Sequence, residues 1–89
     1  MEHNYLEITY RDGRPIAAYY YLPRRPGDRG VRTQRVDPGL VIDFTEDDRP
    51  IGIEITAPGL VSLDDMNRTL RSLGLEAVTA AELAPLHAA

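Results

Sequence analysis

Two acidic residues, Asp43 and Glu54, offer the most direct route to chemistry in this chain. Each lies inside an apolar run, 40–45 or 51–56, and the two runs flank a short polar turn. Their apolar neighbours must face a core, so both carboxylates share the opposite face of the predicted hairpin, directly opposed or diagonal according to register. Two close carboxylates can share a proton or bind a divalent cation.

A small-ligand or divalent-metal site at Asp43 and Glu54 is therefore one hypothesis. Against it, no third or fourth ligand stands at a fixed spacing from the pair. A solvated polar face explains the same residues, with an arginine from the preceding strand to pair with the carboxylates. We prefer that interpretation, which assigns no metal and no cofactor to the chain.

The other candidates for catalysis or metal binding have simpler structural explanations. Glu46–Asp48 resembles the start of a calcium loop but lacks its glycine and distal glutamate, which predicts an acidic turn. His3 and His87 are isolated and are expected to be exposed, and His87 to lie in a frayed tail. Ser62 is outside any Gly-x-Ser-x-Gly motif and suits a helix N-cap. Without a nucleophile–base pair or a phosphate loop, we expect no catalytic residues and no enzyme.

Arginines and tyrosines gather in one part of the sequence. Residues 24–35 contain five arginines and one aspartate, and they follow the three tyrosines 19–21. A loop of solubilising arginines is the simpler explanation of this cluster. Because arginine and tyrosine are over-represented at interface hot spots, the functional interpretation is a partner-binding surface made of Tyr19, Tyr21, Arg32 and Arg35. The net charge of −4 argues against a nucleic-acid partner.

Composition indicates a small bacterial cytoplasmic protein. Eighty-nine residues suffice for one domain, predicted over residues 1–89, and a domain of this size gains stability from association. There is no cysteine, so packing alone must hold the fold. We expect no signal peptide and no membrane span, which would need about 20 apolar residues. All ten cationic residues are arginine, a bias typical of high-GC bacterial coding.

Hydrophobic periodicity predicts five strands followed by helices. The expected strands cover residues 6–10, 16–22, 31–37, 40–45 and 51–56. A Leu/Met stripe between Ser62 and Gly74 predicts a helix over 63–73, and Thr79 opens a possible short second helix. The fold class is α+β: a single antiparallel sheet over 5–56, ordered as a meander, with a helical part over 62–86 packed on one face.

The second expected strand is apolar on both of its faces. Ile16, Ala18, Tyr20 and Leu22 share one face, and Ala17, Tyr19 and Tyr21 share the other. The predicted helix can cover only one face of the sheet, so the tyrosine face is left for association. We therefore expect a homo-oligomer, at least a dimer, or a complex with another protein.

Two motifs resemble a known bacterial family. One is the tyrosine-rich end of the first hairpin, Ala17-Ala18-Tyr19-Tyr20-Tyr21-Leu22, and the other is an acidic hairpin, 43–55, that closes in Gly52-Ile53-Glu54-Ile55. Over residues 5–57 they are similar to domain of unknown function 2283. Where the family often has a glycine in the acidic turn this chain has Asp48, which tolerates left-handed backbone. The family's Ala-Asp pair in the first hairpin is absent here.

The resemblance implies a β-sheet domain and partner binding, including toxin–antitoxin-like pairing, and it implies no catalytic residues. Together with the tyrosine face, it leads to a functional hypothesis. The protein is expected to be a non-enzymatic protein-interaction module, which self-associates or pairs with another protein, antitoxin-like pairing included. The alternative is the small-ligand or divalent-metal domain described above.

Overall fold

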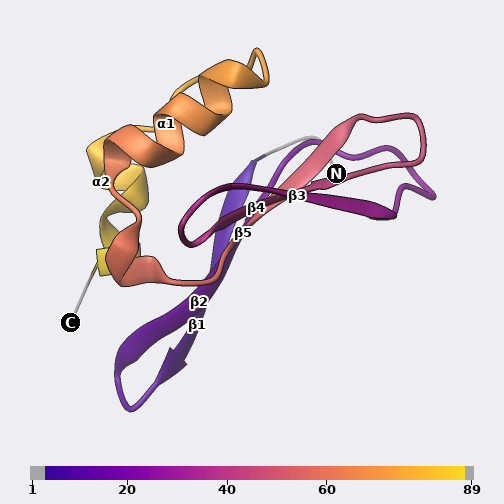
Figure 1. Cartoon of the computed structure of the whole chain (residues 1–89). Helices are drawn as coiled ribbons and strands as arrows, with labels where there is room; N and C mark the ends of the chain where they lie inside the picture. The colour runs from indigo at the N-terminus through magenta and orange to yellow at the C-terminus, as the bar shows by residue number, and fades with distance from the viewer. Residues whose placement is uncertain (1–3, 88–89) are drawn as a thin grey trace.

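A five-stranded antiparallel sheet with helices on one side forms the whole of the described structure, a computed structural model that describes residues 4–87 (Figure 1). The strands are β1 (Tyr5–Arg11), β2 (Arg14–Tyr21), β3 (Arg32–Asp37), β4 (Leu40–Phe44) and β5 (Pro50–Ile55). The helical part contains the short 3-10 helix η1 (Pro58–Leu60), α1 (Leu63–Ser72), α2 (Ala80–Leu83) and the 3-10 helix η2 (Ala84–His87). The α+β class and the antiparallel sheet are confirmed.

The order of the strands differs from the predicted meander. The sheet runs β1-β2-β5-β4-β3, so the chain leaves β2 and crosses to the far edge before it returns through two hairpins. This is a Greek-key arrangement of β2 to β5. The loop 22–31 covers the distance, because three strand spacings amount to only about 15 Å. The crossover places the polar strand β3 at an edge and the apolar β4 and β5 in the centre.

An ion pair fastens the crossover to the β4–β5 turn. The guanidinium of Arg49 donates to both carboxylate oxygens of Asp28, over 2.9 and 2.6 Å. Asp28 also accepts from the backbone N–H of Arg25 at 2.9 Å. The bonds between Arg49 and Asp28 join residues that are 21 positions apart and hold the loop where it passes the hairpin.

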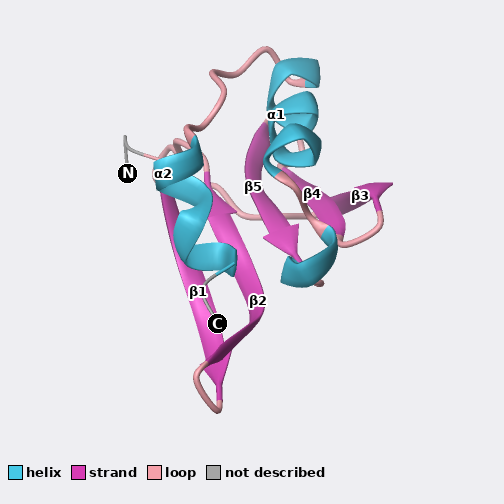
Figure 2. Cartoon of the chain, turned by 90° about the vertical axis from the view of Figure 1, so that its left-hand side faces the viewer, coloured by secondary structure: helices cyan, strands magenta, loops and turns pink. Residues whose placement is uncertain are grey.

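The helices cover one face of the sheet, as both views show (Figure 1, Figure 2). Met66 and Leu70, from the predicted stripe, are fully buried and belong to a single core cluster with the sheet. The sheet contributes the inward residues Ala18, Tyr20, Leu40, Ile42, Phe44, Ile53 and Ile55, and the short helices contribute Leu83 and Leu86. Burying an aliphatic side chain of this size contributes roughly 1.5–3 kcal/mol, so this layer is the main source of stability.

Capping residues mark the starts of α1 and α2, and the end of α1, where the sequence predicts them. Ser62 and Thr79 each form a capping box, in which the hydroxyl accepts from the third helical N–H and an acidic side chain bonds back. Gly74 follows α1 with a φ of +74°, as expected of a helix stop. Buried Asn67 was not singled out in the sequence. Its amide pairs with both backbone groups of Val78, at 3.1 and 2.8 Å, and so ties the α1–α2 connection to the helix.

Two turns use aspartate in the left-handed region. Asp12 and Gly13 have φ values of +51° and +77°, which suits the tight turn between β1 and β2. Asp48 has a φ of +62°, as the comparison with the family's glycine predicts. Among residues 4–87, no helix is long and apolar enough to cross a membrane.

Candidate functional site

The face of the sheet away from the helices, called the open face below, brings most of the predicted site residues together. The strand register shows which residues share this face: Tyr5, Glu7, Ala17, Tyr19, Tyr21, Gly52, Glu54, Val41, Asp43, Thr33 and Arg35. The end of the crossover loop and this face enclose a hollow of about 520 Å³. It is lined by Tyr19, Arg24, Gly30, Val31, Arg32, Thr33, Asp43, Ile51 and Glu54.

Tyr19 spans three strands in this hollow. In the register, Tyr19 lies beside Glu54 and Asp43 lies beside Gly52. The phenol nevertheless crosses β5 and donates a hydrogen bond of 2.8 Å to Oδ2 of Asp43. Gly52 makes this possible, because a methyl group at that position would overlap the ring and hydroxyl of Tyr19. The phenol ring of Tyr19 therefore packs directly on the backbone of Gly52, the glycine of the Gly-Ile-Glu-Ile motif.

Arg24 and the neighbouring tyrosines complete an aromatic and cationic layer. The Nη2 of Arg24 donates to the Tyr19 hydroxyl at 3.2 Å, and its guanidinium lies 5.2 Å from the ring centroid of Tyr21. Tyr21 stacks on Tyr5 with centroids 4.4 Å apart and meets Tyr19 edge-on at 4.6 Å. The Tyr21 hydroxyl also donates to Glu7 at 3.2 Å. These contacts hold three rings in fixed positions on the surface.

The two carboxylates lie diagonally, on neighbouring strands, which resolves the alternative left open by the sequence. Partial burial, followed by the negative charge of Asp43, raises the pKa of Glu54. Burial and the hydrogen bond to Asp43 raise the pKa of Tyr19, so its phenol stays protonated and acts as a donor. Oδ1 of Asp43 is buried and has no hydrogen-bond partner within residues 4–87. A hydrogen bond between the side chains of Glu54 and Asp43 also raises the pKa of Glu54.

The hollow does not have a metal-ligand constellation. No group of three or more histidines, cysteines or carboxylates that could hold a metal ion occurs in the part of the chain that the structure describes. The acidic turn has other uses. Asp47 accepts from Thr45 and Arg49, and Asp48 pairs with Arg32 at 2.9 Å.

Arg32 and Arg35 lie on opposite faces of β3. Arg35 is exposed on the open face, beside Val41. The guanidinium of Arg32 instead lies 4.2 Å from the ring centroid of Phe44, on the core side of the sheet. Of the four residues predicted to bind a partner, Tyr19, Tyr21 and Arg35 therefore share a face, whereas the Arg32 side chain turns to the other.

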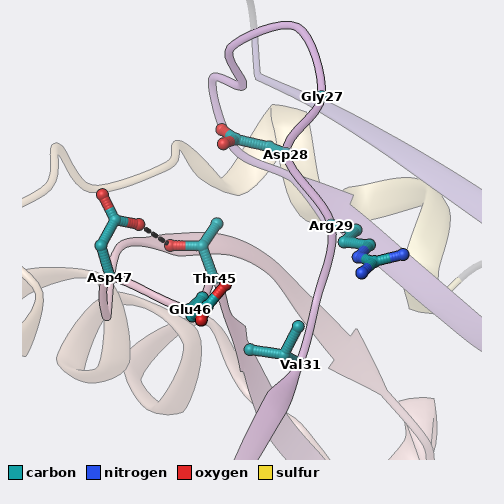
Figure 3. A pocket seen from close by; sticks show the side chains of 7 residues that line it. All are labelled: Gly27, Asp28, Arg29, Val31, Thr45, Glu46 and Asp47. Carbon is teal, nitrogen blue, oxygen red and sulfur yellow. Dashed lines mark hydrogen bonds between the residues drawn. The ribbon is translucent and has the colours of Figure 1, made fainter.

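A second hollow, of about 400 Å³, lies between the crossover loop and the β4–β5 turn (Figure 3). Its lining residues are Gly27, Asp28, Arg29, Val31, Thr45, Glu46 and Asp47. The hydrogen bonds from Arg49 and from the Arg25 N–H lower the pKa of Asp28 to about 2. In Figure 3 the Arg29 side chain points away from the carboxylates of Asp28 and Asp47. Two of its charged residues, Asp28 and Asp47, are bonded to Arg49 and so belong to the clamp.

The remaining sequence candidates have structural roles. Ser62 caps α1, as predicted. His87 was expected in a frayed tail, but it belongs to η2 and its Nε2 lies 2.7 Å from the carbonyl oxygen of Val61. That contact fastens the end of the helical part to η1. His3 lies outside the described residues.

Sequence reasoning missed the roles of Gly52, Arg24 and Ile51. A glycine in the middle of a strand was an available signal, because it marks a close approach or a bulge. Here both occur: Asp43 pairs with Gly52 while Phe44 pairs with Pro50, which leaves Ile51 as an extra residue. Ile51 lines the open-face hollow and is 1% exposed, so the crossover loop covers it.

Residues 17–57 match the family described as Protein of unknown function (DUF2283). The chain resembles this family from β2 to the end of β5, which includes Tyr19, Asp43, Gly52 and Glu54. The expected resemblance is confirmed over this span, while residues 5–16 lie outside it. Neither the search of curated proteins nor that of solved structures found a match.

Proposed function

We propose that this protein is a non-enzymatic interaction module of the bacterial cytoplasm, which binds another protein, or a second copy of itself, through the bare side of its sheet. The observation that carries the proposal is the difference in cover between the two faces. Ile42, Ile53 and Ile55 on the helix side are 0–2% exposed. Their neighbours on the open face, such as Val41 and Tyr19, are only half-buried.

The chemistry of the open face suits protein binding. Tyrosine combines a large apolar area with a polar end, and few rotatable bonds must be frozen when it binds. Tyr5 is 42% exposed and stacks on Tyr21, which in turn lies under Arg24. Rings held in place before binding lower the entropic cost of association. Arg35 adds an exposed cation at the edge of this face.

The reactive groups nearby support a binding role over catalysis. Tyr19 is a protonated donor to Asp43, and the hydroxyl of Ser62 accepts a backbone N–H. Asp43 accepts the hydrogen bond of Tyr19, but the pKa of that phenol is raised, so it is held as a hydrogen-bond donor and is not activated as a nucleophile. The family that residues 17–57 match has no described function, so a toxin–antitoxin-like partner is part of the proposal and would be identified by the cross-linked product.

Site-specific photo-cross-linking tests the proposed surface. A photoreactive amino acid replaces Arg35 on the open face or, as the control, Arg71 on the exposed side of α1, in cells that make the protein. We expect a discrete cross-linked species from position 35 and none from position 71. Equal labelling from both positions, or no product from position 35, would contradict the use of the open face.

A second candidate function, small-ligand binding, is favoured by the hollow itself. The carboxyl groups of Asp43 and Glu54 line a space of about 520 Å³, and burial and Asp43 raise the pKa of Glu54. We expect no change in melting temperature with Ca²⁺, Mg²⁺ or Zn²⁺, since the ligand set is too small. A clear rise with one of these ions that disappears in Asp43→Asn would favour the second candidate over the first.

A further inference from the structure

We propose that the outer edge of β1 pairs with the same edge of a second copy of this chain. The two strands run antiparallel around a two-fold axis at Ile8, so that a single sheet continues through the dimer. The inference deepens the proposed function by naming one partner, and it concerns the edge of the sheet instead of its open face.

The two edges of the sheet differ in how well they can accept another strand. On β3, Arg35 pairs with Val41 and Asp37 with Leu40, so Val36 is an extra residue that bends the edge. Bulges and charged side chains are the usual means by which an edge is protected against pairing. In β1 all seven residues pair in succession with β2, and the extra residue there belongs to β2. β1 carries the charges of Glu7 and Arg11 but contains no bulged residue, so its backbone can pair along the whole strand.

The backbone groups that β1 directs outward follow from the register. Leu22 donates its N–H to the carbonyl oxygen of Ile51, so even-numbered residues of β2 face β5. Tyr19 and Tyr21 then face β1, opposite Glu7 and Tyr5. Because backbone direction alternates along a strand, the N–H and C=O groups of Leu6, Ile8 and Tyr10 face away from β2, and no strand among residues 4–87 pairs with them.

On the helix side of the sheet, an axis at Ile8 brings apolar residues together. Ile8 lies opposite its own copy, and Leu6 lies opposite Tyr10. The β1–β2 hairpin projects beyond the other strands (Figure 2), which leaves Tyr10 52% and Ile16 45% exposed. A second copy would cover Tyr10, because Leu6 of the other strand would lie beside it.

On the open side, the same axis places no two like charges opposite each other. Glu7 lies opposite Thr9, and Tyr5 lies opposite Arg11, a pair suited to a cation–π contact. The axis is also the midpoint of β1, so every residue of the strand finds a partner. An axis at Glu7 would place two glutamates in direct opposition, and an axis at Thr9 would end the pairing at the turn. The sequence of β1 is thus complementary to itself in one register.

Disulfide cross-linking tests this register, because the chain has no cysteine of its own. In the proposed pairing Glu7 of one copy lies opposite Thr9 of the other, in a non-hydrogen-bonded pair with Cα atoms about 4.5 Å apart. That distance permits a disulfide, whereas two copies of the same position lie more than about 7 Å apart. We expect an oxidised mixture of Glu7→Cys and tagged Thr9→Cys to form the mixed dimer, and neither variant alone to form a dimer. Efficient cross-linking of Thr9→Cys with itself, or no mixed product, would overturn the proposal.

A charge pair at one exposed position gives a second measurement. Thr9→Glu places a carboxylate opposite Glu7 of the other copy, once on each side of the axis, and should weaken the dimer by about tenfold, whereas Thr9→Arg should tighten it. Sedimentation over a concentration series measures both, and the melting temperature at high dilution shows that the fold is retained. A dimer that responds to neither variant would contradict the β1 edge, while cross-linking from position 35 would still decide the proposed function separately.

Discussion

The two faces of the sheet are built on different principles. On the helix side, Met66 and Leu70 pack on the strands, and stability comes from the apolar area that is removed from water. On the open face, Tyr19 crosses Gly52 to reach Asp43, and a few directed contacts hold the surface in place. The first face needs only side chains of the right kind and size. The second depends on individual partners, which is typical of a surface under functional constraint.

The largest expected effect is a charge placed in the helix-side layer. Leu70→Asp puts a carboxylate at a fully buried position without a partner, and the cost of several kcal/mol approaches the total stability of a small domain. We expect no cooperative thermal transition by circular dichroism. Arg71→Asp, one residue later on the exposed side of α1, is the control and should retain the transition. A native melt for Leu70→Asp would contradict the packing of α1 on the sheet.

A methyl group added at Gly52, under the ring of Tyr19, tests the corresponding contact on the open face. Gly52→Ala forces the phenol away from Asp43 and should destabilise the fold by about 1–3 kcal/mol. In a Tyr19→Ala background the same change should cost far less, because the clash is gone. Urea denaturation of the four chains measures this coupling. Gly59→Ala, at a site open to solvent, is the neutral control, and strictly additive costs would refute the contact.

Acid should weaken the clamp between the crossover and the β4–β5 turn. The pKa of Asp28 falls from its ordinary value of 3.8 to about 2, chiefly through its bonds to Arg49. A lowered carboxyl pKa contributes stability above pH 3.8, and this contribution is lost as the pH falls toward 2. Asp28→Asn should therefore be less stable at neutral pH and lose less on acidification. Thermal melts from pH 2 to 7 measure how the melting temperature depends on pH, and the control Glu76→Gln should keep the wild-type dependence. The same dependence in Asp28→Asn would contradict the clamp.

The smallest expected effect concerns Glu54, whose pKa is raised by burial and by Asp43. A raised carboxyl pKa means that the native state holds the proton more tightly, so wild-type stability falls as the pH rises above the ordinary value of 4.5. Glu54→Gln should thus be more stable at pH 7 by about 0.2–1 kcal/mol, the scale of a cross-strand charge contact. The gain should vanish below pH 4.5, and Glu46→Gln, in the exposed turn, should show none. A destabilised Glu54→Gln at pH 7 would contradict the repulsion.

The features that the sequence predicted correctly depend on neighbouring residues. The caps at Ser62 and Thr79, the Asp12-Gly13 turn and the left-handed Asp48 are each determined by local backbone chemistry. The shared face of Asp43 and Glu54 follows from strict alternation along two strands. These features need no knowledge of how distant segments meet.

The strand order and the Tyr19 contact could not be obtained in this way. Short loops permit a meander and do not require it, and the bond between Arg49 and Asp28 joins segments far apart in the sequence. The polarity of β3 on both faces was a usable sign of an edge strand. Gly52 was a sign of close approach, but nothing in the sequence says which side chain approaches it.

The solution mass tests the central claim, that the bare side and edge of this sheet are association surfaces, most directly. Light scattering over a micromolar concentration series compares the unmodified chain with Thr9→Glu. The account predicts a particle of twice the chain mass of 9.9 kDa for the unmodified protein, and a shift toward the single chain for the variant. A monodisperse particle of 9.9 kDa at every concentration would contradict self-association, and only a different protein could then cover this surface.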